Sequence, residues 1–339
     1  MIFEKDSDEI RWAAELFENG WHARAQRALE AANGAGVFER LGKEPAAARR
    51  LAEDLGLDPA AAEKVLIVLA AMGLVDRDGH AWRLTPKAEA TLLPDAPCYQ
   101  GNMLAHTADV WAFWSDLESA LHGEKGGWVF DPAGRPPVRS HRNFILGMHN
   151  VAMAGRAAEL AERVDLSKIR TRSGAGRRTL MDVGGGPGTY AAALCERYPD
   201  LTATVMDLPE TIEIARGVIE KLGMSDRVRT VAGDWNEDEF GAGNDAVLLS
   251  SVLHGPTSAA EMKLEKARRS MNPGGLLIVQ DFVMNAEKTG PLIPAVFNVM
   301  VGAFSLTELA DRIAAAGFSG LQVKPMPRYA GTTVLTAVR

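Results

Sequence analysis

A short apolar run that leads directly into a glycine-rich turn is the feature that most constrains this chain. Residues 179–189 read Thr-Leu-Met-Asp-Val-Gly-Gly-Gly-Pro-Gly-Thr. Gly184, Gly186 and Gly188 have no Cβ, so a ligand can lie against the backbone there. A helix that begins near Thr189 would present its unpaired N–H groups to that ligand. The pattern predicts a strand, a nucleotide-binding turn and a helix.

Three strand ends carry an acidic residue, and their chemistry indicates the cofactor. A dinucleotide site would read G-x-G-x-x-G, whereas this chain reads G-x-G-x-G. Asp182 can pair with the ammonium group of an amino-acid moiety, and Asp207 can accept hydrogen bonds from both hydroxyls of a ribose. Asp234 and Trp235 suit the amino group and the face of an adenine. One Asp at a strand end is usually a turn former, but three in register favour a ligand, and S-adenosylmethionine has all of these groups. The predicted cofactor contacts are Asp182, Gly184, Gly185, Gly186, Gly188, Asp207, Leu208, Gly233, Asp234, Trp235 and Ser250.

Composition limits the class of protein. The 339 residues are 47% apolar and 24% charged, which is typical of a globular protein with room for two domains. No basic-then-apolar leader and no run of 18 apolar residues occurs, so we expect a cytoplasmic protein without membrane contact. Two cysteines are too few for a disulfide framework or a zinc site, and we expect no metal. A net charge of −7 argues against broad binding to nucleic-acid phosphates.

The N-terminal part of the chain has the pattern of a winged helix. Amphipathic helices are predicted over 37–41, 47–57 and 61–75, and a turn at 76–79 separates two short strands. Residues 1–100 contain 12 Lys and Arg against 17 Asp and Glu. Because an excess of acidic residues disfavours binding to phosphates, the wing is expected to contact protein rather than DNA.

The remainder of the chain changes from helices to regular strand and helix alternation. Residues 101–165 are predicted to be mainly helical, with interruptions at 123–127 and 131–137. Near-continuous apolar strands separated by helices predict an α/β domain whose parallel sheet is covered on both faces. The last two strands are short and closely spaced, so they are expected to be antiparallel. The predicted strands are 179–184, 202–208, 227–233, 245–253, 275–282, 321–324 and 332–338, and the predicted helices are 189–198, 210–222, 258–271 and 305–316.

Almost the whole chain resembles the two-domain, small-molecule O-methyltransferases that include plant caffeate enzymes and bacterial tailoring enzymes. The motifs that carry the resemblance lie at 51–57, 68–74, 84–86, 182–188, 207–209, 233–234 and 273–275. The resemblance implies a Rossmann-like class I methyltransferase domain at 166–339, with a mostly parallel seven-stranded sheet that binds S-adenosylmethionine. It implies a winged-helix dimerisation domain at 1–100 and a helical linker at 101–165 that contributes to the substrate pocket. It further implies a homodimer whose partner chain helps to close that pocket.

His254 matches the general base of this family, but its surroundings depart from the family pattern. It is followed by Gly-Pro-Thr instead of Asp and Trp, and residues 302–305 read Gly-Ala-Phe-Ser instead of Gly-x-Glu-Arg. The acidic partner that orients the base is therefore expected to be absent. A thioether sulfur needs no base, so these departures slightly favour S-methylation of a thioether. In length and in the same departures the chain also resembles the bacterial methylthiohydroxybutyrate S-methyltransferases of dimethylsulfoniopropionate synthesis, and this resemblance implies a thioether acid such as 4-methylthio-2-hydroxybutyrate as the acceptor. The alternatives are a phenolic or enolic hydroxyl with His254 as base, and a regulatory protein that keeps the fold without turnover.

The segment before the catalytic domain supplies the candidate acceptor contacts. In the family, a helix here covers the donor and the substrate with aromatic residues and methionines. A carboxylate on the acceptor would need a cation, for which His141 and Arg156 are further candidates. Core packing explains the methionines equally well, and a solvated helix face explains the arginines. The predicted acceptor contacts are Trp114, Arg142, Phe144, Met148, His149 and Met153.

Overall fold

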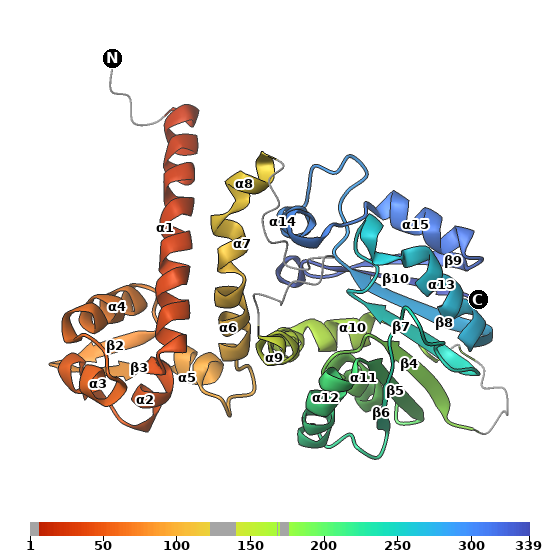
Figure 1. The fold of residues 1–339 in the computed structure, drawn as a ribbon, viewed down its shortest axis with the longest axis horizontal. Helices are drawn as coiled ribbons and strands as arrows, with labels where there is room; N and C mark the ends of the chain where they lie inside the picture. The colour runs from red at the N-terminus through yellow and green to blue at the C-terminus, as the bar shows by residue number, and fades with distance from the viewer. Residues whose placement is uncertain (1–6, 123–139, 168, 170–175) are drawn as a thin grey trace. The chain divides into compact units, whose positions relative to one another are not determined.

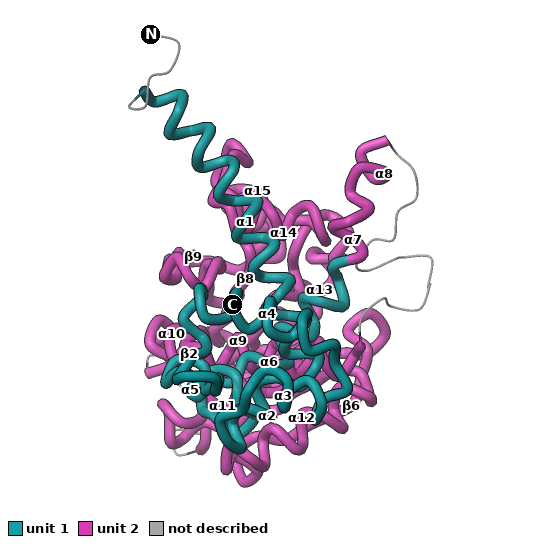
Figure 2. Tube along the Cα trace, turned by 90° about the vertical axis from the view of Figure 1, so that its left-hand side faces the viewer, with its two compact units in different colours: residues 1–111 teal, residues 112–339 magenta. Residues whose placement is uncertain are grey.

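The computed structural model describes residues 7–122, 140–167, 169 and 176–339. The chain folds into two compact units, Met1–Trp111 and Ala112–Arg339 (Figure 2). The interruptions predicted at 123–127 and 131–137 lie outside the described residues. The division of the sequence at 100 and 165 stays a prediction, and the compact units themselves meet at residue 111.

The first unit consists of a long helix, α1 (Asp8–Gly34), and a small domain of short helices with a β-hairpin (Figure 1). The hairpin predicted around 76–79 is present, since β2 (Val75–Asp78) pairs with β3 (Ala81–Leu84) in antiparallel register. The core of this unit includes Phe38, Leu51, Leu69 and Trp82, all of which are buried. The other elements are α2 (Val37–Lys43), β1 (Ala46–Ala47), α3 (Ala48–Leu55), α4 (Pro59–Ala71), α5 (Pro86–Leu92) and α6 (Gly101–Asp109).

The second unit is built around the expected seven-stranded, mostly parallel sheet, with strand order β6-β5-β4-β7-β8-β10-β9 (Figure 1). The first five strands of the chain in this sheet are parallel, and β10 is antiparallel to both of its neighbours, as predicted for the last pair. From β4 the chain first builds outward through β5 and β6 and then returns to β7 on the other side. This strand reversal places a ligand crevice at the carboxyl end of β4. The strands are β4 (Arg178–Val183), β5 (Leu201–Asp207), β6 (Val228–Ala232), β7 (Asn244–Ser250), β8 (Met271–Asp281), β9 (Ser319–Pro325) and β10 (Thr333–Val338).

Helices cover both faces of the sheet, because the strands are apolar on both sides. Successive strand residues such as Leu180 and Met181 belong to different buried clusters. One cluster is completed by α10, α11 and α12, and the other by α13 and α15. These helices, with the remaining ones of the unit, are α7 (Trp111–Ser115), α8 (Leu117–Leu121), α9 (His141–Val151), η1 (Ala152–Arg156), α10 (Ala157–Arg163), α11 (Thr189–Arg197), α12 (Pro209–Lys221), η2 (Pro256–Ser258), α13 (Ala260–Ser270), α14 (Leu292–Val301), α15 (Leu306–Ala315) and η3 (Arg328–Ala330).

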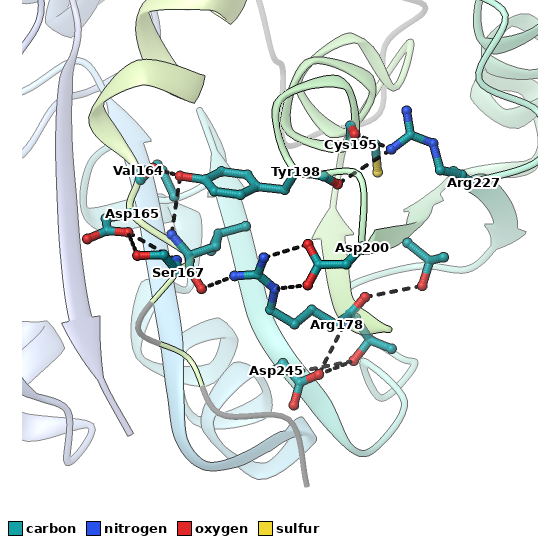
Figure 3. Close-up of polar contacts among 12 residues, drawn as sticks. Val164, Asp165, Ser167, Arg178, Cys195, Tyr198, Asp200, Arg227 and Asp245 are labelled. Carbon is teal, nitrogen blue, oxygen red and sulfur yellow. Dashed lines mark hydrogen bonds and ion pairs between the residues drawn. The ribbon is translucent and has the colours of Figure 1, made fainter. Parts of the chain in front are cut away.

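The amino end of β4 is fixed by charged and polar contacts (Figure 3). Arg178 donates from Nε and Nη2 to the carboxylate of Asp200, at 2.8 and 2.5 Å, and from Nη1 to the carbonyl of Leu166. Tyr198 donates its hydroxyl to the carbonyl of Val164 at 2.7 Å. These bonds join the end of the helical cover to the start of the central strands. They lie at the amino ends of the strands, so the opposite, carboxyl edge is left for the site.

One helix of the cover is interrupted. Ser140 caps α9 by accepting a hydrogen bond from the Asn143 amide, and the segment η1 that follows contains a kink between α9 and α10. At the kink Ala154 has ψ 25° and Gly155 has φ +107°, a conformation that favours glycine. The chain therefore changes direction between the two helices.

Candidate active site

A pocket lies at the carboxyl ends of β4, β5 and β6, where the strand reversal places it. Six of the predicted cofactor contacts line it. The lining residues are Val183, Gly184, Met206, Asp207, Leu208, Gly233, Asp234, Trp235 and Asn236.

Asp182, near the end of β4, is fully buried, and among the described residues no side chain bonds to its carboxylate oxygens. Burial, and then the charge of Asp207, raises the pKa of Asp182 to about 7, although the Ala191 amide lies near enough to oppose that rise. A Cβ on Gly185 would lie 2.6 Å from the Asp182 carboxyl carbon, so the glycine loop wraps closely around this group. An unpaired buried carboxylate is costly unless a cation reaches it. Asp182 therefore fits the ammonium group of an amino-acid moiety.

Asp207, at the end of β5, is held in place by the backbone. The Gly186 amide donates to Oδ2 and the Leu208 amide donates to Oδ1, each at 2.8 Å. The Thr211 hydroxyl also bonds to this carboxylate, so one of its roughly four acceptor positions is open, and a ligand hydroxyl could replace Thr211 at another. Burial raises the pKa of Asp207, and the two backbone donors oppose that rise. This arrangement fits a pair of ribose hydroxyls.

Trp235 packs directly on the glycine loop. A Cβ on Gly184 would lie 2.4 Å from the indole ring, and Gly184 has φ +63°, so this position requires glycine. The next acidic residue, Asp234, accepts a hydrogen bond from the Asn236 amide at 2.8 Å. The pocket thus has an aromatic face and a carboxylate side by side, as an adenine would need.

Five predicted cofactor residues lie outside this lining: Asp182, Gly185, Gly186, Gly188 and Ser250. A Cβ on Gly188 would meet Ile219 and Val205 at 3.0–3.3 Å, so Gly188 serves the packing of α11 against the sheet. Ser250 is the last residue of β7 and is partly buried. Neither is among the residues that line the pocket.

His254 lies in a tightly anchored loop that follows β7. The Ser251 amide donates to the carbonyl of Gln280 at 2.7 Å, and the Leu253 amide donates to Oδ2 of Asp281 at 3.1 Å. Lys263 donates to the carbonyl of Val252 at 2.9 Å. These anchors hold the imidazole in one place, which is what a positioned base requires.

Asp281 brings a carboxylate near His254 from another part of the chain, although the family's acid at 302–305 is absent. Its Oδ1 lies 3.9 Å from the buried Nδ1 of His254, and burial raises the pKa of Asp281 to about 7. Burial, and then the charge of Lys263, lowers the pKa of His254 to about 4. The imidazole is therefore neutral at physiological pH and can accept a proton. Residues 302–305, which correspond to the family's acidic segment, lead into α15 instead. Ser305 and Glu308 form the capping box of that helix.

Aromatic rings adjoin the histidine. The Phe297 ring meets the His254 ring edge to face at 5.3 Å and stacks on Phe282 at 4.0 Å. The guanidinium of Arg156 lies 5.7 Å from the centre of the Phe282 ring. Sequence reasoning missed both phenylalanines and Asp281. The signal for Asp281 was available, since it ends the strand next to the one that precedes His254.

The predicted acceptor contacts differ in their surroundings, and one of them, His149, contacts the cofactor side of the unit. His149 Nδ1 lies 2.8 Å from the hydroxyl of Thr189, which begins α11, so the covering helix reaches the cofactor side of the unit. Arg142 is exposed and fits a solvated helix face. Trp114 meets Phe113 edge to face, with 5.1 Å between the ring centres. Trp114, Phe144, Met148 and Met153 are not fully buried.

Neither a metal site nor a membrane span is evident in the described part of the chain. No group of three or more His, Cys, Asp or Glu residues is placed to hold a metal ion there. None of the described helices has the length and hydropathy needed to cross a bilayer.

Comparison with known proteins gives consistent matches. A sequence profile of the O-methyltransferase domain matches residues 139–316. The 3-hydroxy-5-methyl-1-naphthoate 3-O-methyltransferase of Streptomyces sahachiroi is 31% identical over 307 residues, which are 86% of this chain and 85% of that protein. The N,N-dimethyltransferase OxyT of Streptomyces rimosus is 28% identical over 92% of each chain. Human N-acetylserotonin methyltransferase, solved in complex with SAM, has the same fold, with a TM-score of 0.81 and 21% identity over 99% of each chain.

Proposed function

The chain belongs to the family of S-adenosylmethionine-dependent small-molecule O-methyltransferases, and from this premise we propose that it methylates a phenolic or enolic hydroxyl with His254 as the general base. The observation that carries the proposal is the position of the Asp281 carboxylate, 3.9 Å from His254, beside an aromatic wall. A thioether acceptor would need neither a neutral imidazole nor a carboxylate near it. The slight preference of the sequence for S-methylation depended on the absence of both groups that support this histidine in the family, and Asp281 offers a carboxylate from a different strand.

Residues at the strand ends fit the cofactor. Asp182 would hold the ammonium group, Asp207 the ribose hydroxyls, and Asp234 with Trp235 the adenine. When bound, S-adenosylmethionine supplies an electrophilic methyl group on a sulfonium. Because the donor is already activated, the main task of the protein is to position and deprotonate the acceptor.

His254 performs the proton transfer in this proposal. Its Nδ1 faces Asp281, so the Nε2 atom takes the proton of the acceptor hydroxyl as that oxygen forms its bond to the methyl carbon. The carbon–sulfur bond breaks, and its electron pair stays on sulfur. The carboxylate of Asp281, 3.9 Å from Nδ1, stabilises the imidazolium that results through its charge. Phe282 and Phe297 offer a flat apolar surface to a planar acceptor.

The names of the relatives support this choice of acceptor. The Streptomyces sahachiroi protein is named for methylation of an aromatic hydroxyl, and OxyT for methylation of nitrogen. Neither name mentions sulfur. S-methylation of a thioether acid remains the second candidate, because residues 254–257 lack the Asp and Trp of the family motif. A regulatory protein without turnover is disfavoured, because the chain belongs to a family of methyltransferases and six of the candidate cofactor residues line one pocket.

For the whole chain, we propose that residues 1–100 form a winged-helix dimerisation domain and that the protein is a homodimer. Residues 101–165 would form the linker that contributes to the acceptor pocket, and residues 166–339 the domain that binds the cofactor.

The test of the function is kinetic. Radiolabelled donor is offered with a panel of phenols, enols and thioethers to the wild-type protein and to His254→Gln and Asp281→Asn variants. For a hydroxyl acceptor, His254→Gln should lower kcat by about 10²–10⁴-fold, the usual contribution of a positioned base. Asp281→Asn should lower it less. Ser258→Ala, which changes the same loop without changing a charge, is the control. A His254→Gln variant that turns over at the wild-type rate would rule out the base.

A further inference from the structure

Arg156 is a cation that the proposed reaction does not use, and its surroundings are unusual. Its side chain is partly buried, and burial lowers its pKa from the ordinary value. No ion pair joins Arg156 to a carboxylate among the described residues, whereas the neighbouring Arg163 pairs with Glu159. Its contacts are with the ring of Phe282 and the hydroxyl of Tyr190.

The backbone sets the direction of Arg156. The kink between α9 and α10 lies immediately before this residue, and the positive φ of Gly155, +107°, requires glycine there. A Cβ on Gly155 would lie 3.1 Å from the Tyr329 hydroxyl, so space also favours glycine. A regular helix would direct the residue elsewhere.

The polar groups around Arg156 are arranged for an anion. Gln280 donates to the Tyr190 hydroxyl at 3.0 Å, and Arg156 also bonds to that hydroxyl. The oxygen of Tyr190 is thus occupied as an acceptor, and its hydrogen can be donated. A guanidinium and a hydroxyl would then present several donors to one ligand, and the guanidinium fork matches a carboxylate in shape and charge.

The position of Arg156 joins the two halves of the site. Tyr190 follows the glycine loop, on the cofactor side. Phe282 stacks on Phe297, which contacts His254 on the acceptor side. We propose that Arg156 binds a carboxylate at the junction of the cofactor and acceptor pockets. The carboxylate comes either from the amino-acid part of the cofactor or from an aromatic hydroxy acid that serves as acceptor. This inference rests on the proposed function.

Calorimetry with two matched ligand pairs tests the inference and identifies the source. S-adenosylhomocysteine and 5′-methylthioadenosine differ by the amino-acid moiety. 3-Hydroxy-1-naphthoate and its carboxamide, titrated in the presence of S-adenosylhomocysteine, differ by the carboxylate. Arg156→Gln should weaken the binding of one acid by about 10- to 100-fold and leave its uncharged counterpart unchanged. Loss with S-adenosylhomocysteine identifies the cofactor as the source, and loss with the naphthoate identifies the acceptor.

Two further variants separate binding from folding. Arg156→Lys keeps the charge and should recover part of the affinity, and the exposed Arg216→Gln should bind like the wild type. Equal weakening of charged and neutral ligands by Arg156→Gln, or unchanged binding of all four, would overturn the inference. A wild-type protein that binds these acids through Arg156 but transfers no methyl group would overturn the proposed function alone.

Discussion

The protonation state of Asp182 is expected to make cofactor binding depend on pH, because burial raises the pKa of this carboxyl group. The raised pKa of about 7 means that the carboxyl group is largely protonated below neutral pH in the free protein. A ligand ammonium would favour the ionised form. The affinity for S-adenosylhomocysteine should therefore rise by up to about tenfold per pH unit as the pH increases toward 7, and then level off. Calorimetry in buffers of different ionisation enthalpy would detect the proton released on binding below pH 7. Asp182→Asn should bind more weakly and lose this pH dependence; if the dependence persists, another group is responsible.

Burial lowers the pKa of His254, whereas it raises that of Asp182, and this affects the pH dependence of the reaction rate. Its pKa is lowered to about 4 because the ring is buried, so the base is neutral above that pH. At saturating donor and acceptor, kcat should therefore show no acid limb near 6.5, the ordinary value for histidine. Protonation of Asp281, whose pKa is about 7, removes the charge that stabilises the imidazolium, so a shallow decline below pH 7 is expected to disappear in Asp281→Asn. A steep acid limb at 6.5 that survives in that variant would contradict the burial of His254.

At the scale of elements, the glycine loop makes a prediction about packing. Gly184 and Gly223 both have a left-handed backbone, with φ of +63° and +67°. A Cβ on Gly184 would overlap Trp235, whereas a Cβ on Gly223 would have nothing within 4 Å. Gly223→Ala should cost about 1–2 kcal/mol of stability from the backbone alone. Gly184→Ala should cost several kcal/mol and abolish cofactor binding, because the indole must move. Chemical denaturation and calorimetry measure both effects, and equal losses in the two variants would show that the Trp235 contact is unimportant.

The elements of the catalytic unit follow from the sequence because their signals are local. An apolar run, an acid and a glycine turn recur at the end of β4 and, in part, at β5, so Asp182 and Asp207 are predictable from the amino-acid sequence alone. Asp281 is not predictable from its own neighbourhood, since its role depends on β8 lying next to β7. Arg156 is only one of several candidate cations in the sequence, because a helical pattern does not reveal the kink at Gly155 that precedes it. Functional residues are thus predictable from the sequence where they lie at the end of a single strand. They are not predictable where the site forms from two segments that are distant in the sequence.

At the scale of the whole molecule, α1 supports the proposed dimer. Trp12, Leu16, Phe17 and Trp21 are 56–76% exposed on this one helix. Burial of such side chains contributes roughly 1.5–3 kcal/mol each, and a concentrated exposed apolar surface indicates an interface. The protein should be dimeric by light scattering at micromolar concentration. Leu16→Glu combined with Trp21→Glu should give a folded monomer, while Val231→Glu, on an exposed position of the sheet, should leave the dimer intact. A wild-type protein that is monomeric at this concentration would rule out the proposed dimer.

The central claim, that oxygen and not sulfur accepts the methyl group, can be read from the product. The protein is incubated with S-adenosylmethionine carrying a ¹³C-labelled methyl group, in one mixture with aromatic and enolic hydroxyl compounds and 4-methylthio-2-hydroxybutyrate. Carbon NMR distinguishes a methyl group on oxygen from one on a sulfonium. We predict labelled methyl ether that is lost in His254→Gln. Labelled sulfonium, formed equally well by wild type and His254→Gln and without any methyl ether, would contradict the account.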